Sequence, residues 1–528
     1  MQRFSEKLKT GLRAVGGFFK SLWQTSLSPF FCKIGRVFTT EKCKKFGRNI
    51  LSGKINFLSV AALLALYGIL ISAIVTIFST NGQALSSILF YNSDDFFMDF
   101  FNPMSDSDYP GLYKEYRILY TPLVNIPLNL MLHLIPQYEY LDAFGLRSTQ
   151  VGMLCFCLAF IPVSIAFAVL LYKEKKGTPV EKVLFVVAMY LSVGMISVFD
   201  RGNVIIYAIF FSSAFLAFYR SEKWWVREIS YVCLALAVCI KIYPVFLGIL
   251  ILRDKQWTGA LRTMIYGLVL LIMPFLYYGN MAENIYYFFI SIFNFGGAEV
   301  PEIQVSNPIL PMEGMTEIVD GEERHFFYSY SGQIVYFDYI DGKTAFSFTG
   351  SFQILFAMLY KNYETLAVSE KLAKGILFLC FVASLFQNDE WKSATLLTIF
   401  SFTFTSSTYT YSLGFMILPF VMFLNKANFK NPLHWIYAAL FIAILGSVVW
   451  PEQYFHVDNW YQNEEFYYLN YTNIVQRFSV LIMTFLLICE GVFHTILLLE
   501  DFIIFCIRKH KQRELRAKVE VKPATVRK

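Results

Sequence analysis

The chain has 528 residues, of which 56% are hydrophobic, 18% aromatic and only 16% charged, and its mean hydropathy is +0.49. This composition excludes an ordinary soluble globular protein and indicates a membrane protein. The net charge of +6 is concentrated at the two ends, since residues 1–54 carry 12 Lys and Arg against 2 acids and residues 508–528 carry 9 against 2. Basic ends beside membrane spans are typical of cytoplasmic segments near anionic lipid, and we expect no nucleic-acid binding.

Apolar stretches of roughly 15–25 residues recur from Ile55 to Ile507, as expected for many spanning helices. We therefore predict an all-α polytopic membrane protein with a basic cytoplasmic segment at 1–54, a transmembrane domain at 55–507 and a basic cytoplasmic tail at 508–528. Because the first apolar run follows a long basic segment, we expect a retained span rather than a cleaved signal peptide. The nine Cys form no metal-type pair and are interpreted as small buried hydrophobes.

The first span is expected at about 55–80, and it leads to an outer loop at 81–145. Within that loop, Pro122, Pro127 and Pro136 interrupt the apolar run 118–136. Proline in a helix interior removes a hydrogen bond and kinks the helix, so we predict a membrane-edge or re-entrant helix here rather than a second span. This choice also keeps the basic loops further along the chain on the cytoplasmic side.

Later spans are expected at about 146–172, 180–199, 204–219, 260–278, 372–386, 393–405, 409–424, 433–449 and 474–507. The run 229–252 is interrupted at Lys241–Pro244, so we predict two short helices that meet there in a broken hairpin. Further outer loops are placed at 279–371 and 450–473. Together these elements predict about 12 transmembrane helices with both termini in the cytoplasm.

Three carboxylates lie at the water boundary after the first span. Asp94, Asp95 and Asp99 are interleaved with Phe and Met, so we expect this segment to pack against membrane or protein. If it is helical, Asp95 and Asp99 share a face at i,i+4, and two carboxylates close together in an apolar setting raise one pKa and prepare a general base. A metal site and an ordinary solvated loop are the alternatives.

Two cations lie near the outer ends of predicted spans in apolar surroundings. An ionisable residue at membrane depth indicates function by default; Arg201 offers a planar fork for a phosphate, and Lys241 offers a point charge. The alternatives are that Asp200 merely neutralises Arg201 in a tight turn, and that Lys241 extends its ammonium group to water.

In this order and spacing, the residues resemble the polytopic glycosyltransferases of the GT-C superfamily, most closely glycosyltransferase family 87. The resemblance covers roughly residues 55–450. It rests on Asp99-Phe100-Phe101 in the acidic outer loop, Tyr120-Thr121-Pro122-Leu123, the Gly202-Asn203 turn that opens a span, and Lys241-Ile242-Tyr243-Pro244. The chain has Arg-Gly-Asn where relatives often show Gly-Gln-x-Asn, and one Pro after the Tyr where they often have two.

The resemblance implies a GT-C-type bundle and a transferase that needs no metal and no cofactor. Such enzymes take a sugar from a polyprenyl-phosphate donor and pass it to a glycolipid or glycan acceptor at the outer face of the cytoplasmic membrane. An Asp of the first outer loop acts as the base, and Asp99 matches that position, with Asp94 or Asp95 as alternatives.

The same resemblance places the donor phosphate beside Arg201 and Lys241. The other residues that we expect to contact substrate are Asn203, Tyr243 and Tyr120. Membrane lipids are the remaining expected partners.

Two other functions fit parts of the sequence. A transporter or flippase of lipid-linked sugars predicts inverted repeats and charges near mid-bilayer, and the sequence shows no such repeat. An outer-face glycan polymerase or ligase would centre its chemistry on Arg324 and His325 in the loop 279–371.

Overall fold

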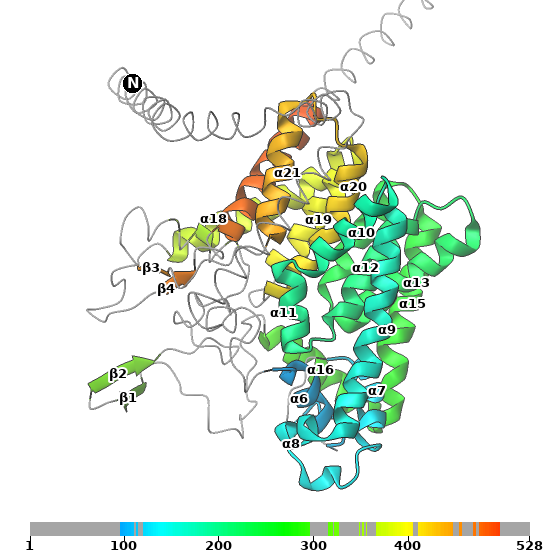
Figure 1. Ribbon diagram of the computed structural model, residues 1–528, viewed down its shortest axis with the longest axis vertical. Helices are drawn as coiled ribbons and strands as arrows, with labels where there is room; N and C mark the ends of the chain where they lie inside the picture. The colour runs from blue at the N-terminus through cyan, green and yellow to red at the C-terminus, as the bar shows by residue number, and fades with distance from the viewer. Residues whose placement is uncertain are drawn as a thin grey trace, which may run out of the picture. The chain divides into compact units, whose positions relative to one another are not determined.

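The computed structural model describes residues 96–109, 112–114, 120–295, 315–319, 322–326, 348, 351–352, 355, 366–404, 410–446, 454–456, 468–470 and 475–496. Almost all of them are helical, as Figure 1 shows. Strands occur in this part of the chain only as two short antiparallel hairpins, β1 (Met315–Val319) with β2 (Glu322–Phe326) and β3 (Tyr454–His456) with β4 (Tyr468–Asn470). The predicted helical class is confirmed apart from these hairpins. The predicted terminal segments and the first span lie outside the described residues.

The helices before the long loop share short connections. They are α6 (Met98–Asp106), α7 (Pro122–Leu132), η2 (Tyr138–Tyr140), α8 (Ala143–Ser148), α9 (Gln150–Glu174), α10 (Pro179–Tyr190), α11 (Val193–Arg201), α12 (Ile205–Phe218), α13 (Trp224–Ile240), η3 (Tyr243–Gly248), α14 (Ile249–Arg253), α15 (Trp257–Ile272), η4 (Met273–Tyr278) and α16 (Met281–Phe295). The later helices are α18 (Leu366–Phe386), α19 (Glu390–Phe404), η7 (Thr410–Met416), α20 (Ile417–Lys426), α21 (Pro432–Leu445) and a helix at Val475–Ile496.

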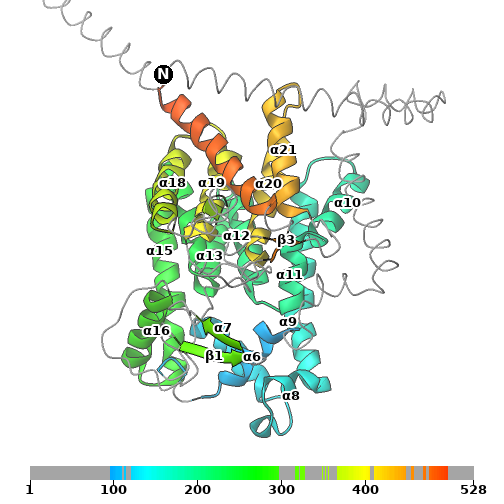
Figure 2. The same ribbon diagram turned by 90° about the vertical axis from the view of Figure 1, so that its left-hand side faces the viewer.

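Two antiparallel helices, α12 and α13, organise the packing around the site. A short loop joins them, α15 packs against α13 and α9 packs against α12, and Figures 1 and 2 show these helices side by side. α12 is apolar on all sides and largely buried, which is the pattern of a helix enclosed by neighbours. A residue before α12 and a residue after α13 therefore lie at the same end of this pair.

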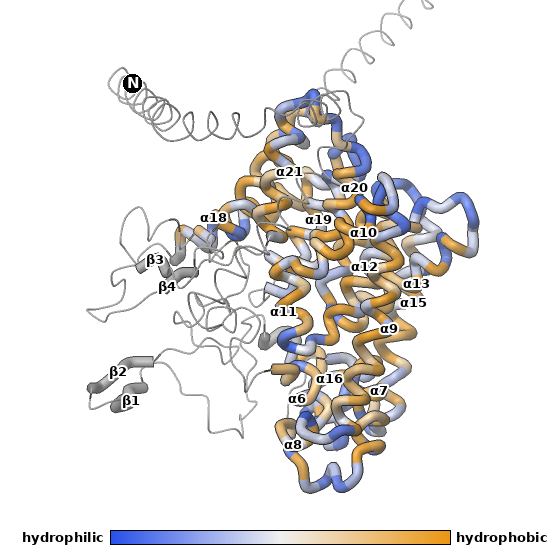
Figure 3. The backbone as a smooth tube through the Cα atoms, in the orientation of Figure 1, coloured by the Kyte–Doolittle hydropathy of each residue, from blue (hydrophilic) through white to orange (hydrophobic). Residues whose placement is uncertain are grey.

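The centre of the described bundle is α19. Every residue from Trp391 to Thr403 is buried, and α18, η3, α20 and η7 surround the helix. Figure 3 shows hydrophobic residues along the helices and hydrophilic residues gathered in loops at their ends. This distribution is the one expected for a membrane domain.

Three helices in the described ranges are long and apolar enough to cross a membrane: Gln150–Glu174, Trp257–Tyr278 and Val475–Ile496. A fourth span arises if α10 and α11, bent by 55° at their junction, count as one. The expected number of about 12 is not confirmed, because several predicted spans fold as apolar helices of 10–17 residues, such as Ile205–Phe218 and Pro432–Leu445. Such helices are shorter than the roughly 20 residues that cross a bilayer unaided.

Two local predictions from proline agree with the structure. Within the described residues 120–136, the apolar run folds as the short helix α7, which has Pro122 at its first position and Pro127 inside. The run 229–252 is broken at Lys241, where α13 ends and the 3-10 helix η3 begins with Pro244 near its start. Proline explains both features, because it fits the first turn of a helix and interrupts a longer one.

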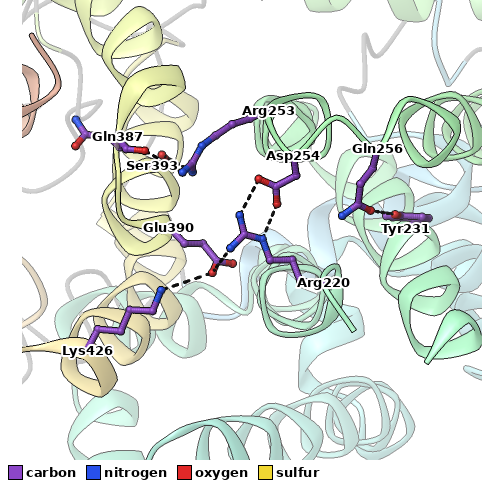
Figure 4. A network of polar contacts seen from close by, with 9 residues as sticks. All are labelled: Arg220, Tyr231, Arg253, Asp254, Gln256, Gln387, Glu390, Ser393 and Lys426. Atoms are coloured by element: carbon purple, nitrogen blue, oxygen red, sulfur yellow. Dashed lines mark hydrogen bonds and ion pairs between the residues drawn. The ribbon is translucent and has the colours of Figure 1, made fainter. Parts of the chain in front are cut away.

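Loops at the far end of α12 and α13 are tied by charge (Figure 4). Arg220 donates to both carboxylate oxygens of Asp254, at 2.5 and 2.7 Å, and to Glu390 at 2.8 Å. Lys426 lies 3.9 Å from the same glutamate. Hydrogen bonding to Asp254 raises the pKa of the Arg220 guanidinium. This network joins the ends of α12, α14, α19 and α20.

Candidate active site

The turn Arg201-Gly202-Asn203 joins α11 to α12 and builds one side of the site. Gly202 ends α11 in the left-handed conformation, with φ +62°, and donates its N–H to the carbonyls of Phe199 and Val198. Asn203 accepts from the N–H of Ile205, the first residue of α12, at 2.9 Å and so fixes the turn that leads into the helix. The turn therefore fixes Arg201 as the last residue of one helix and Asn203 at the start of the next.

The start of α6 builds the other side. Phe97 precedes the helix in a left-handed conformation that a bulky residue rarely adopts, and its N–H donates to the carbonyl of Asp200 at 2.9 Å. A Cβ on Gly202 would lie 2.9 Å from the Phe97 Cα, so the two left-handed residues pack backbone to backbone. Arg147 of α8 donates to the Phe96 carbonyl at 2.8 Å and holds the same segment from outside.

Asp99 lies in the first turn of α6 and points into this junction. Its Oδ1 accepts from Arg201 Nε at 3.2 Å and Nη2 at 2.7 Å, and its Oδ2 accepts from Asn203 Nδ2 at 2.7 Å. The Asp99 side chain is 18% exposed and that of Arg201 31%. A carboxylate has about four lone-pair positions, so these three hydrogen bonds leave one acceptor position on Oδ2.

Lys241 and two tyrosines lie next to this carboxylate. Lys241 follows the last residue of α13, and its Nζ lies 4.4 Å from the centre of the Tyr120 ring. Tyr120 interacts electrostatically with Asp99, Arg201 and Tyr243, and Lys241 interacts with Asp99. The Tyr243 ring packs edge-on against Phe415 of η7, with centroids 5.7 Å apart. The site therefore combines a carboxylate, two cations and two aromatic rings.

The structure brings together most of the side chains that the sequence singled out. Asp99 contacts Arg201 and Asn203 directly and interacts with Lys241 and Tyr120, and Tyr243 joins them through Tyr120. Asp94 and Asp95 lie outside the described residues. The helix α6 begins at Met98, after the left-handed Phe97, and the predicted i,i+4 alignment of Asp95 with Asp99 stays a prediction.

Several supporting residues were missed by the sequence analysis. Thr121 donates to the Cys239 carbonyl at 2.5 Å, and so ties the start of α7 to the end of α13. Asn125 is fully buried and donates to Tyr113 Oη at 3.0 Å and to the Tyr120 carbonyl at 3.2 Å. A signal existed for Asn125, since it is an amide inside an apolar proline-bounded helix. Tyr113 and Arg147 carry no comparable signal, because their contacts are distant in sequence.

A buried arginine lies within the predicted span 474–507. Arg477, near the start of the helix Val475–Ile496, is 1% exposed.

In the described part of the chain, no three His, Cys, Asp or Glu side chains are grouped as metal ligands. The six described cysteines are free, and four of them are buried.

Comparison with known proteins adds a match over part of the chain. The described chain is a helical membrane protein with a charged site at helix ends, and residues 130–315 match the family model of glycosyltransferase family 87. Over these residues the match confirms the resemblance seen in the sequence, and it indicates a glycosyltransferase. It includes Arg201, Asn203, Lys241 and Tyr243 but begins after Asp99. No curated protein and no solved structure matches the chain.

Proposed function

We propose that this glycosyltransferase moves a sugar from a polyprenyl-phosphate donor to a hydroxyl of a glycolipid or glycan acceptor, with Asp99 as the general base. The observation that carries the proposal is the contact of Asp99 with Arg201 and Asn203 beside Lys241. Such a reaction needs a base at the acceptor hydroxyl and positive charge at the phosphate that leaves. The site offers both within one group of residues.

The hydrogen bonds of Asp99 orient it for this role. Arg201 occupies Oδ1 with two donors and Asn203 occupies one position on Oδ2, so an acceptor hydroxyl donates to the remaining position on Oδ2. Because Arg201 and Asn203 belong to the ends of two rigid helices, the carboxylate needs little reorganisation when the hydroxyl binds.

The chemical step is a single displacement. Asp99 takes the proton of the acceptor hydroxyl while its oxygen forms a bond to the anomeric carbon. The bond between that carbon and the phosphate oxygen breaks, and the polyprenyl phosphate leaves with the electron pair. Lys241 and Arg201 stabilise the charge that develops on the phosphate. One displacement inverts the configuration at the anomeric carbon, and Asp99 then releases its proton to water.

Aromatic and apolar surroundings suit the other parts of the donor. Tyr120 presents its ring beside Lys241, and Tyr243 interacts with Tyr120; aromatic faces stack on the C–H side of sugar rings. The span Trp257–Tyr278 is only 11% buried and packs on α13, whose end carries Lys241. It therefore leaves apolar surface for lipid close to the proposed phosphate position.

The proposal includes a place for the site in the cell. We infer that the domain at 55–507 is a GT-C-type bundle in the cytoplasmic membrane, with Asp99 at the outer face and the basic segments 1–54 and 508–528 in the cytoplasm. The basic ends and the acidic loop 81–145 support this orientation. The Arg220 network, at the other end of α12, then lies at the cytoplasmic face.

The test is a transfer assay with the full chain in lipid nanodiscs. Synthetic polyprenyl-phosphate donors with different labelled sugars are incubated with total membrane glycolipids and glycans, and labelled product is counted. We expect transfer from at least one donor, and a fall of about a hundredfold or more in Asp99→Asn, because a positioned base contributes that much.

Asp94→Asn and Asp95→Asn serve as matched variants in the same assay. If one of them abolishes transfer while Asp99→Asn does not, the base is assigned wrongly. If all three variants keep full activity, the mechanism is wrong. Movement of intact donor across a bilayer without transfer would instead indicate a flippase, and loss of activity only in Arg324 and His325 variants would indicate a polymerase or ligase.

A further inference from the structure

A second polar group lies at the other ends of α6 and α7. It consists of Asp108, Asn129, His133, Tyr138 and Tyr277, called here the Asp108 cluster. Asp108 follows the end of α6, and Asn129 and His133 lie at the end of α7. Both helices begin at the candidate active site, with Asp99 in the first turn of α6 and Tyr120 just before α7. The two helices pack together, so they run side by side from the site to the cluster.

Buried Asn129 organises the Asp108 cluster. Its Nδ2 donates to Asp108 Oδ1 at 3.2 Å, and its Oδ1 accepts from Tyr277 at 2.7 Å. Tyr138 donates to Asp108 Oδ2 at 3.3 Å, and its ring lies 4.8 Å from the His133 ring. Asn129 is 3% exposed and Tyr277 51%. A rigid amide thus holds a carboxylate and an aromatic ring at the surface.

His133 brings an imidazole to the surface beside the carboxylate. Its Nδ1 lies 2.8 Å from the carbonyl of Asn129, and a carbonyl only accepts, so Nδ1 carries a proton and donates to it. Its Nε2 lies 3.5 Å from Asp108 Oδ1, which is longer than an ordinary hydrogen bond. The two groups therefore present polar atoms side by side at the surface, within reach of neighbouring hydroxyls of one ligand.

The composition of the cluster is that of a carbohydrate site. Exposed tyrosine rings offer flat apolar faces, while the carboxylate accepts hydrogen bonds from neighbouring hydroxyls and the imidazole offers a second polar partner. Asp108 and His133 are 44% and 46% exposed, so a ligand reaches them without rearrangement. An ion-binding role is less well matched, since the group contains a single carboxylate.

The distance between the Asp108 cluster and Asp99 sets the length of a ligand that contacts both. Asp99 lies in the first turn of α6, and Asp108, nine residues later, lies just after the end of that helix. At a rise of 1.5 Å per residue, the two residues are about 10–15 Å apart. A single sugar ring bound at Asp99 does not reach the cluster, whereas a short oligosaccharide does. Resting on the proposed function, we propose that the Asp108 cluster binds the distal sugar units of an oligosaccharide acceptor whose reactive end lies at Asp99.

Binding of defined sugars to the full chain in nanodiscs tests this proposal without any turnover. Saturation-transfer NMR measures the Kd of linear mannotriose, maltotriose, galactotriose and cellotriose and of the matching monosaccharides. At least one trisaccharide is expected to bind about tenfold or more tightly than its monosaccharide. Asp108→Asn and Tyr277→Leu should each remove that advantage, since a hydrogen bond to a charged group and a stacked ring are each worth about tenfold.

Two control variants separate this subsite from its surroundings and from the catalytic proposal. Glu139→Gln, at an exposed acid of the neighbouring η2, and Asp99→Asn should both keep the preference for the trisaccharide. The proposal is overturned if no trisaccharide binds better than its monosaccharide, or if the Asp108 and Tyr277 variants bind as the wild type does. Failure of the transfer assay with this binding intact would count against the proposed reaction alone.

Discussion

Both ends of the α12–α13 pair hold an arginine against carboxylate, yet the two ends differ in what surrounds the contact. At one end, Arg220 joins Asp254 and Glu390 in loops between four helices. At the other, Arg201 and Asn203 hold Asp99, and Lys241 lies over the Tyr120 ring. Each end has a left-handed non-glycine residue, Lys255 beside Asp254 and Phe97 before Asp99, so backbone conformation does not distinguish them. The difference lies in the second cation, because Lys426 lies beside the Glu390 carboxylate and Lys241 lies beside an aromatic ring.

The comparison shows why a salt bridge alone does not indicate function. Every hydrogen bond of the Arg220 end connects the ends of helices, so its expected contribution is to stability. The Asp99 end keeps one acceptor position on Oδ2 and has a second cation, Lys241, whose Nζ lies 4.4 Å from the centre of the Tyr120 ring.

The largest difference in kcat/KM between the two ends is expected from substituting the lysines that flank α13. Lys241→Gln removes a cation from the proposed phosphate position and should lower kcat/KM about a hundredfold, as loss of one preorganised stabilising group does. Lys223→Gln changes the exposed residue before the same helix and should leave kcat/KM unchanged. Steady-state transfer with a saturating acceptor measures both. Equal losses in the two variants would remove the distinction between the ends.

A smaller effect is expected from the turn that positions Asp99. Gly202 has a left-handed conformation, and the methyl group of Gly202→Ala would lie 2.9 Å from the Phe97 Cα. Phe97 must therefore move, and Asp99 moves with it. We expect kcat to fall about tenfold, because small displacements of a catalytic group are costly. Gly267→Ala is the control, since a Cβ there meets nothing within 4 Å. Activity that is preserved in Gly202→Ala would show that this junction does not set the geometry.

The smallest effect on activity is expected at the Arg220 end. Arg220→Gln breaks three hydrogen bonds to carboxylates that are only 14% and 15% exposed, and should cost about 1 kcal/mol of stability. Thermal unfolding in nanodiscs should show a lower Tm, with kcat/KM at 25 °C unchanged. Arg201→Gln should show the reverse pattern. A large loss of kcat/KM in Arg220→Gln with an unchanged Tm would contradict the structural role of the Arg220 network.

Local features of the fold were predictable from the sequence, because proline and charge act over a few residues. The break at Lys241–Pro244 and the short helix α7 both follow from Pro244 and Pro122. The number of spans was not predictable in the same way. Hydropathy finds the apolar run at 180–199 but not its 55° bend at Leu191 and Ser192, which depends on the helices that pack around it.

The candidate site was predictable as a set of residue types but not as an arrangement. Asp99 and Arg201 are 102 residues apart, so their contact depends on tertiary packing that no local pattern encodes. The start of α6 at Met98 was not predictable either, because the preceding Phe97 adopts a left-handed conformation that its residue type disfavours. Asn125 was missed because a buried amide in an apolar helix often has no role in function. Thr121 was named only as part of a motif, because its contact with the Cys239 carbonyl joins residues 118 positions apart.

The most direct test of the central claim is a structure of the full chain with a polyprenyl-phosphonate sugar, a donor analogue whose carbon–phosphorus bond is not cleaved in transfer. The account predicts density for the phosphonate between Lys241 and Arg201, with the anomeric carbon next to Asp99 Oδ2 and the free acceptor position open toward the Asp108 cluster. A phosphonate bound away from Lys241 and Arg201, with Asp99 remote from the sugar, would contradict it.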